Sequence, residues 1–288
     1  MEPRELAFSH IQANGMRLHV AEAGPGNGPL VFLLHGFPES WYAWRGQIGA
    51  LAAAGFRVVA PDQRGYGRSD KPRHASEYRL DVLAADILGL ANAMARDRFC
   101  VVGHDWGASV GWWLATRYPQ RMDRFVALNA PHPVVWHEAM RGDPEQRRKS
   151  WYVRFFRLPA IPEWLLARND YAALAKGFED CIRPGAFTAD DLAIYRSGWS
   201  QPGALTGMLN WYRAILRDPP VPSGELRIAV PTQVIWGVRD RYAGRGLAEA
   251  SVRLCADGRV TYMERATHWV QHDEPGEVAR LCVEFLRG

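Results

Sequence analysis

Lysine, cysteine and long apolar runs are all scarce in this sequence of 288 residues. The 4 cysteines lie far apart, without the close spacing of a metal site or a redox motif, which predicts free buried thiols in a reducing cytosol. No apolar run reaches the roughly 18 residues that a membrane span requires. The N-terminal residues include acids and lack the apolar segment of a signal peptide. These absences predict a cytoplasmic protein with no metal site and no membrane partner.

The charge is also small. Lysine supplies only 3 of the 35 basic residues, the net charge is +4, and the sequence pI is about 9.0. This excess is too slight to indicate a nucleic-acid partner. A hydrophobic fraction of 48% and a charged fraction of 23% are typical of a globular protein with a sizeable core. The length suits one large domain that carries an insertion.

Short apolar runs and helical stretches alternate along the first part of the chain. A predicted hairpin at residues 6–21 turns through Asn14-Gly15, a strong turn signal. The predicted buried strands are residues 30–34, 56–60, 99–102 and 125–128, and the predicted helices are 41–54, 78–95 and 106–118. This alternation predicts an α/β fold, with a mostly parallel sheet covered by helices on both faces.

The pattern then breaks. Residues from about 131 to 227 are rich in Trp, Tyr, Arg and Pro and show no strand pattern, which predicts a helical insertion. Strand-like runs resume at residues 228–236 and 260–263, and residues 277–286 form a closing helix. The expected organisation is therefore a core of residues 1–131 and 227–288 with a helical cap, or lid, at 132–226.

The most informative segment is the turn after the strand at residues 99–102. It has the form glycine, any residue, nucleophile, any residue, glycine, which is the nucleophile elbow of α/β hydrolases. Gly103 and Gly107 flank Asp105, so Asp105 is the predicted nucleophile. The alternative, that Asp105 only caps the following helix, does not account for a glycine on each side.

An aspartate nucleophile restricts the reaction. Aspartate carboxylates are ionised near pH 7, so the first attack needs no base (pKa about 3.9). Such a carboxylate can displace a leaving group at a saturated carbon and form an alkyl ester. Water must then cleave that ester, and this second step needs a base and an oxyanion hole.

A second glycine-flanked candidate lies close by. Ser109 sits within Gly107-Ala108-Ser109-Val110-Gly111, which matches the serine-esterase pattern. It follows Asp105 by four residues, about one helical turn, and so lies beyond the strand end where a nucleophile is needed. Ser109 is therefore interpreted as a packing residue.

The order of the triad in this fold is nucleophile, acid, histidine. Asp240 follows the strand at 228–236 and is the predicted acid, although a simple turn role is the alternative. The other place for an acid, after residue 128, holds Asn129 and Ala130. His268 follows the last strand and is the predicted base, with His272 as the weaker candidate.

The loop after the strand at 30–34 reads His35-Gly36-Phe37-Pro38. A loop at this place supplies one oxyanion N–H and the residue after the nucleophile supplies the other, which assigns the N–H groups of Phe37 and Trp106. His35, Gly36 and Pro38 are expected to support the loop, and the Phe37–Pro38 bond could be cis. A plain Gly-Pro turn is the alternative.

With these residues assigned, the chain resembles the soluble epoxide hydrolases of the α/β-hydrolase fold. The matching pieces are HGFP at 35–38, DQRGYGRS at 62–69, GHDWG at 103–107, WGVRD at 236–240 and HW at 268–269. The Asp62 and Arg64 side chains are expected to hold the second of these loops. The resemblance also implies two cap tyrosines that bind the epoxide oxygen, and these match Tyr152 and Tyr212. Phenols suit this role because they can donate a hydrogen bond to the departing alkoxide.

Haloalkane dehalogenases share most of these motifs and are the nearest alternative. Trp106 would suit a halide site, but Phe37 stands where those enzymes place Asn, and the Arg that follows the aspartate in fluoroacetate-type dehalogenases is absent. A third alternative is a catalytically silent binding protein on the same scaffold, which would be expected to lack a triad member. The expected reaction converts an epoxide and water to a vicinal diol without any cofactor, in a monomer or homodimer.

The start of the predicted cap is basic. Its cations are Arg141, Arg147, Arg148, Lys149, Arg154 and Arg157. The simpler interpretation is a solvated helix face. The alternative is that these cations steer substrates that carry a carboxylate.

Overall fold

A computed structural model describes residues 6–219 and 226–288 of the chain. Its centre is an 8-stranded sheet in the order β1-β2-β4-β3-β5-β6-β7-β8. The strands are β1 (Ala7–Ala13), β2 (Met16–Ala23), β3 (Leu30–Leu34), β4 (Arg57–Pro61), β5 (Phe99–His104), β6 (Met122–Leu128), β7 (Thr232–Gly237) and β8 (Gly258–Met263). All pairs are parallel except β1 with β2 and β2 with β4, so the predicted mostly parallel α/β class is confirmed.

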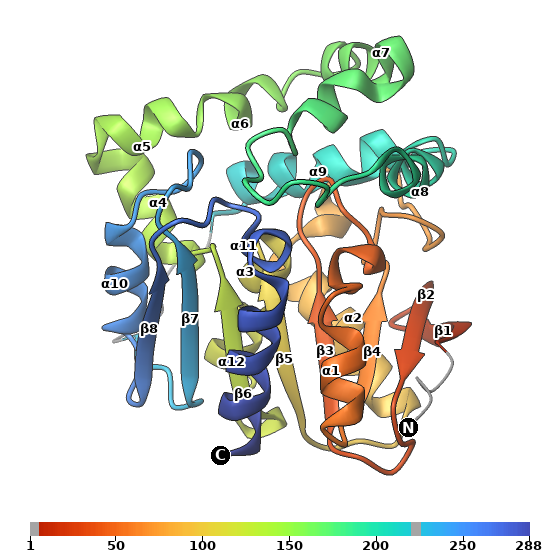
Figure 1. Ribbon diagram of the computed structural model, residues 1–288. Helices are drawn as coiled ribbons and strands as arrows, with labels where there is room; N and C mark the ends of the chain where they lie inside the picture. The colour runs from red at the N-terminus through yellow and green to blue at the C-terminus, as the bar shows by residue number, and fades with distance from the viewer. Residues whose placement is uncertain (1–5, 220–225) are drawn as a thin grey trace.

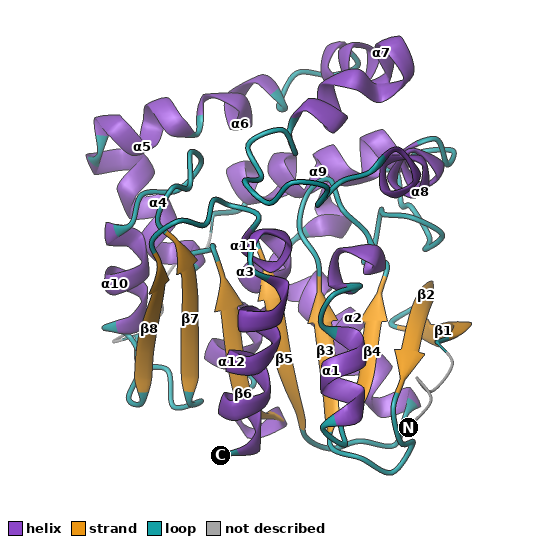
Figure 2. Ribbon diagram, viewed as in Figure 1, coloured by secondary structure: helices purple, strands orange, loops and turns teal. Residues whose placement is uncertain are grey.

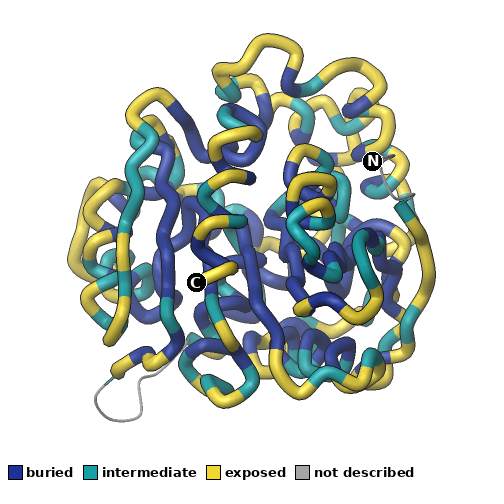
Figure 3. Tube along the Cα trace, turned by 60° about the horizontal axis from the view of Figure 1, so that its bottom comes forward, coloured by how far each residue is buried: buried dark blue, intermediate teal, exposed yellow. Residues whose placement is uncertain are grey.

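Helices cover both faces of the sheet (Figures 1 and 2). One face packs on α2 (Leu80–Ala93), α3 (Trp106–Arg117) and α10 (Gly246–Val252), and the other on α1 (Ile48–Ala53) and α12 (Pro275–Arg287). Side chains alternate between the faces along each strand, so β3 and β5 are buried throughout. Figure 3 shows the central strands in dark blue inside the molecule, whereas the edge strands β1 and β8 are largely exposed or intermediate.

Local details differ from the sequence predictions in three places. Residues 41–54 form a 3-10 turn, η1 (Trp41–Trp44), and the short helix α1 rather than one continuous helix, and between them the Gln47 side chain bonds the backbone carbonyls of Gln271 and Pro275. The strand predicted from residue 228 begins only at Thr232, since Pro231 has no N–H for the ladder. Helix α10 was not predicted at all.

Helices between β6 and β7 lie together above the carboxyl ends of the strands (Figure 1). They are α4 (Pro133–Gly142), α5 (Pro144–Lys149), α6 (Trp151–Phe155), α7 (Ile161–Lys176), α8 (Ala189–Trp199) and α9 (Ala204–Arg217). We therefore propose residues 132–226 as the cap and residues 1–131 and 227–288 as the core, although residues 220–225 of that range and the N-terminal residues 1–5 lie outside the described residues. Among the described residues, no helix has both the length and the apolar character to cross a membrane.

All four cysteines are free thiols, as predicted. Cys100 and Cys282 are buried, whereas Cys181 and Cys255 are only partly buried, which corrects the expectation that all four would be enclosed.

Candidate active site

The turn between β5 and α3 places Asp105 in a strained backbone conformation. Its φ is +50° and its ψ is −121°, a region that non-glycine residues rarely adopt. The turn closes only because Gly103 lies against the backbone of Ala108, and Gly107 lies against the carbonyl of Leu34, where a Cβ would collide. The conformation turns the Asp105 side chain out of the strand and into a cavity beneath the cap.

One oxygen of the Asp105 carboxylate is held by the loop after β3. The backbone N–H of Phe37 donates to Asp105 Oδ1 at 2.9 Å. The Phe37–Pro38 peptide bond is cis, as the sequence suggested. A side chain on Gly36 would collide with the Asp105 carboxylate, so only glycine allows this approach. His35 supports the loop from behind, because its Nε2 accepts a 3.1 Å hydrogen bond from the N–H of Gln63.

The loop at residues 62–69 supports this arrangement in the predicted way. The buried Asp62 carboxylate accepts hydrogen bonds from the N–H groups of Trp41 at 3.0 Å and Arg68 at 3.0 Å. Arg64 forms a buried ion pair of 2.6 Å with Asp86 on α2. The structural role predicted for the Asp62 and Arg64 side chains is confirmed.

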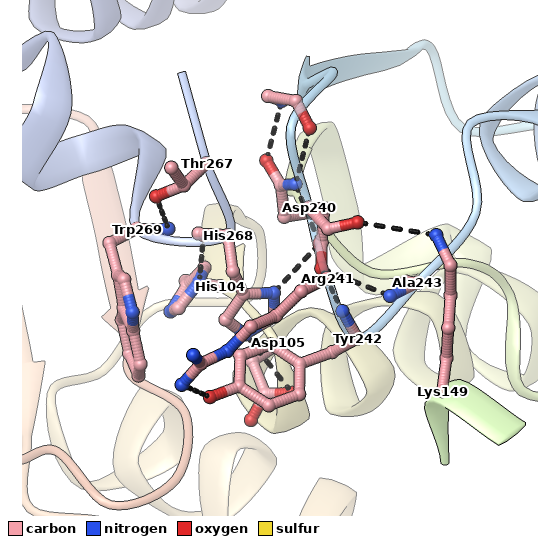
Figure 4. A network of polar contacts seen from close by, with 12 residues as sticks. His104, Asp105, Lys149, Asp240, Arg241, Tyr242, Ala243, Thr267, His268 and Trp269 are labelled. Atoms are coloured by element: carbon pink, nitrogen blue, oxygen red, sulfur yellow. Dashed lines mark hydrogen bonds and ion pairs between the residues drawn. The ribbon is translucent and has the colours of Figure 1, made fainter. Parts of the chain in front are cut away.

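On the other side of Asp105 lies His268, which is buried between two carboxylates (Figure 4). Its Nδ1 donates to Asp240 Oδ2 at 2.8 Å, and its Nε2 lies 3.7 Å from Asp105 Oδ2. Asp240 is fixed in turn, because its Oδ1 accepts from the N–H groups of Tyr242 at 2.6 Å and Ala243 at 3.0 Å. The three predicted triad residues therefore lie in one chain of contacts, in the order Asp105, His268, Asp240.

Sequence reasoning missed a fourth member of this group. Asn129, after β6, donates from Nδ2 to Asp240 Oδ2 at 2.8 Å, and its Oδ1 accepts from the N–H of Gly237 at 2.8 Å. Its φ of +43° orients the side chain toward β7. Asn129 occupies the alternative place for the acid, and that position was the available signal. An amide there holds the Asp240 carboxylate in position without competing for the proton of His268.

The electrostatics of the pair favour a charged histidine. Burial alone would lower the pKa of His268, but the neighbouring Asp240 and Asp105 carboxylates outweigh burial and raise this pKa to about 9. Burial would raise the pKa of Asp240, yet its contact with His268 holds that pKa below the ordinary value. The two carboxylates thus favour the imidazolium form of His268 at neutral pH.

Two tyrosines from the helices above the sheet line the cavity that holds Asp105. Tyr152 on α6 and Tyr212 on α9 lie with ring centroids 6.0 Å apart, and both line the same cavity as Asp105 and His268. Burial, reinforced by the negative charge of Asp105, raises the pKa of each phenol well above its ordinary value. Both hydroxyls are therefore protonated at neutral pH and able to donate a hydrogen bond.

The cavity has two unequal parts that meet at Asp105. The inner part is small, about 80 Å³, and is closed by Trp136, Pro133 and Ile215. The outer part is about 910 Å³ and is lined mainly by apolar side chains of α6 and α7. Lys149 and Arg148, from the basic start of the cap, lie at this outer part.

Of the two other candidates, His272 lies outside the cavity, whereas Ser109 lines its small inner part. His272 does not approach Asp105 but donates to Glu39 Oε1 at 2.7 Å. His104 belongs to the same buried group, and its Nε2 donates to the backbone carbonyl of His268 at 2.9 Å. No pattern in the sequence indicated the role of Glu39 in this group. Burial disfavours the charged form of Glu39, but His272 and His104 lower its pKa strongly. The Ser109 hydroxyl lies 3.5 Å from the Asp105 carbonyl, one turn into α3, as predicted.

Trp106 is the first residue of α3. The N–H groups of the first helical turn have no carbonyl partner within the helix, so its N–H is available to an oxyanion. That the N–H groups of Phe37 and Trp106 act together as an oxyanion hole stays a prediction. Among the described residues, no group of three or more His, Cys, Asp or Glu side chains is arranged to hold a metal ion.

Comparisons with known proteins give one consistent result. Residues 29–275 match the family described as alpha/beta hydrolase fold. The chain is 45% identical over 279 residues to the AB hydrolase superfamily protein YfhM of Bacillus subtilis, covering 96% of each chain. It is 36% identical over 286 residues to epoxide hydrolase 4 of Mus musculus, covering 97% of this chain and 79% of that one. A crystal structure of the Bacillus megaterium epoxide hydrolase with an inhibitor superposes with a TM-score of 0.89 at 31% identity, over 97% of this chain and 100% of that chain.

Proposed function

The chain belongs to the epoxide hydrolases of the α/β-hydrolase fold, and from this we propose that it converts an epoxide and water to a vicinal diol through an ester on Asp105. The observation that carries the proposal is the position of Asp105. Its carboxylate lies between the imidazole of His268 and the N–H of Phe37, in a cavity whose opposite wall holds Tyr152 and Tyr212.

In the first step the two tyrosines bind the epoxide oxygen and Asp105 attacks a ring carbon. The Asp105 oxygen forms a bond to that carbon, the carbon–oxygen bond of the ring breaks, and the electron pair stays on the epoxide oxygen. This oxygen becomes an alkoxide, which is a poor leaving group unless it receives a hydrogen bond or a proton. The two buried, protonated phenols donate hydrogen bonds to the alkoxide, and the proton that His268 loses once Asp105 is an ester converts the alkoxide to a hydroxyl.

In the second step water cleaves the ester. His268 takes a proton from the water, Asp240 keeps the imidazole oriented, and the N–H groups of Phe37 and Trp106 stabilise the oxyanion that forms at the Asp105 carbonyl. The imidazolium of His268 then gives this proton to the diol oxygen as the bond between that oxygen and the Asp105 carbonyl carbon breaks. The diol leaves, the proton of the Asp105 carboxyl group passes to His268, and Asp105 is again a carboxylate beside an imidazolium.

The first step prepares the second. His268 is protonated in the free enzyme, partly because of the negative charge of Asp105. Alkylation turns Asp105 into a neutral ester and removes that contribution, so the pKa of His268 falls. The histidine therefore becomes a competent base only when there is an ester to hydrolyse.

The tyrosine pair favours an epoxide over a haloalkane as substrate. A departing halide needs no proton, whereas an alkoxide does, and two phenols facing the nucleophile serve only the latter need. The completeness of the Asp105, His268 and Asp240 contacts likewise argues against a silent binding protein.

The small inner cavity supports a substrate whose epoxide carries one bulky group. The bulky group fits the outer part of about 910 Å³, and the inner part of about 80 Å³ leaves room for hydrogen or a short chain.

The His268→Ala variant tests the proposed ester. With the base removed, an aryl epoxide such as styrene oxide should alkylate Asp105 and the ester should persist. Intact mass spectrometry should then show a gain equal to the whole mass of the epoxide, since nothing is lost on ring opening, and peptide mapping should locate it on Asp105. His10→Ala, an exposed histidine on β1, is the control and should turn over without an adduct. A His268→Ala protein whose mass stays unchanged while diol still forms would refute the ester.

A further inference from the structure

Large apolar side chains are exposed on one part of the cap. Of the 8 such residues exposed in residues 6–219 and 226–288, 5 fall between residues 151 and 165, on α6, the start of α7 and the loop between them. They are Trp151, Leu158, Ile161, Trp164 and Leu165, with exposures of 66%, 44%, 51%, 59% and 38%. Figure 1 shows α6 and α7 at the outer edge of the molecule, on the side away from the sheet. We call this group the α6–α7 surface.

Arginines accompany these apolar side chains. Arg154, Arg157 and Arg168 are exposed in the same segment. Within the described part of the chain, none of these three forms an ion pair with a carboxylate, and Arg168 lies over the ring of Trp164 at 4.6 Å. The one acid of the segment, Glu163, is already paired with Arg213 on α9 at 2.8 Å. The surface is therefore both apolar and positively charged.

We propose that the α6–α7 surface docks on a membrane surface that contains anionic lipid. Trp, Leu and Ile beside unpaired arginines are the composition of interfacial segments, which bury apolar side chains at the level of the lipid headgroups. Anionic headgroups would pair with the guanidinium groups, which have no carboxylate partner in the protein. The sequence predicted no membrane partner because it lacks a spanning segment, but surface docking requires none.

A second copy of the chain fits this surface less well. In a two-fold symmetric dimer the same patch occurs on both sides, so Arg154, Arg157 and Arg168 of the two copies would face one another across a dry contact. Such repulsion is avoided when the partner carries negative charge. Charge complementarity therefore favours an anionic lipid surface.

The α6–α7 surface is also continuous with the outer cavity. Trp151 and Leu165 belong to the surface and line the cavity of about 910 Å³, which reaches Asp105. An apolar epoxide dissolved in the membrane could enter this cavity directly from the lipid. This delivery of substrate rests on the proposed function, whereas docking itself does not.

The test is sedimentation of the full chain with vesicles of phosphatidylcholine alone or mixed with phosphatidylglycerol. The protein should bind the mixed vesicles, and binding should weaken as salt is raised. The variant Ile161→Ser/Trp164→Ser and, separately, the variant Arg154→Glu/Arg157→Glu should each bind at least about tenfold more weakly. Phe8→Ser, which removes an equally exposed apolar residue on β1, is the control and should bind like the wild type.

Turnover of a soluble epoxide and light scattering separate a loss of lipid binding from misfolding and from loss of a dimer. Turnover of a water-soluble epoxide should be unchanged in Ile161→Ser/Trp164→Ser, because neither residue lines the cavity, and this shows that the variant is folded. If Ile161→Ser/Trp164→Ser is inactive, its loss of vesicle binding is uninformative. The vesicle binding of Arg154→Glu/Arg157→Glu, which is altered only at exposed arginines, then tests the proposal. The proposal is overturned if the wild type does not bind mixed vesicles or if the variants bind as it does. It is equally overturned if light scattering shows a dimer that the variants lose while no protein binds lipid.

Discussion

The Nε2 atom of His268 lies 3.7 Å from the Oδ2 atom of Asp105. This contact joins the predicted base to the predicted nucleophile, and the charge of Asp105 contributes to a pKa of about 9 for His268. The two residues therefore do not act independently: the protonation of one depends on whether the other is a carboxylate or an ester.

Removing the charge of Asp105 should accordingly lower the pKa of His268. In Asp105→Ala the imidazolium is favoured by Asp240 and, to a smaller extent, by Asp180, and burial opposes it. The pKa of His268 measured by histidine NMR titration should be about 9 in the wild type and clearly lower in the variant. An unchanged or higher value in Asp105→Ala would show that the two groups are not coupled.

The same coupling predicts the pH dependence of ester hydrolysis. A raised pKa means that His268 is protonated below that value, so the base is lost as pH falls through the pKa. In the ester the Asp105 charge is absent, and the midpoint should lie below the free-enzyme value of about 9. Rapid-quench measurement of ester decay from pH 5 to 10 gives this midpoint, and a midpoint at or above the free-enzyme value contradicts the scheme.

Replacing either cap tyrosine should slow only the first step. Tyr152→Phe and Tyr212→Phe each remove one donor to the alkoxide, so the rate of ester formation should fall about 100-fold while ester hydrolysis is unchanged. Single-turnover kinetics separate the two rates. Tyr242→Phe is the matched control, because Tyr242 also lines the cavity but accepts a hydrogen bond from Arg241 at 2.7 Å. If Tyr242→Phe slowed ester formation equally, Tyr152 and Tyr212 would have no special role as donors to the alkoxide.

Asn129 should behave as a positioning residue for the acid. Asn129→Gly keeps the positive φ available but removes the amide that holds Asp240. Ester hydrolysis should slow about tenfold, the ester should accumulate at steady state, and ester formation should be unaffected. A loss of stability with both rates unchanged would assign Asn129 a purely structural role.

Trp136 should limit the groups that the small inner cavity accepts. In Trp136→Ala the ratio of kcat/KM for an internal, disubstituted epoxide to that for a terminal epoxide should rise at least about tenfold. Phe155→Ala, on the wide outer side, should leave this ratio unchanged. If both variants change the ratio alike, the inner cavity does not select the substrate.

The sequence predicted the parts of this site that depend on local pattern. The two glycines around Asp105, the run before Asp240 and the place of His268 after the last strand are short-range signals, and each residue lies where it was expected. The central strands could be predicted because buried parallel strands are short, continuous apolar runs.

The rest depends on contacts between distant segments. Asn129 meets Asp240 across 111 residues, and Glu39 meets His272 across 233, so neither contact leaves a pattern in the chain. The Gln47 side chain likewise bonds the backbone carbonyl of Gln271, 224 residues away. The start of the cap was predicted to be basic, but not that Arg148 and Lys149 would reach the outer cavity.

The most direct test of the ester on Asp105 is a single turnover with excess enzyme and styrene oxide in water enriched in heavy oxygen. If Asp105 attacks the epoxide, the first diol takes its oxygen from the carboxylate and is unlabelled, and the label appears in the peptide that contains Asp105. If the first diol carries the label and the peptide does not, water attacked the epoxide directly, and Asp105 is not the nucleophile.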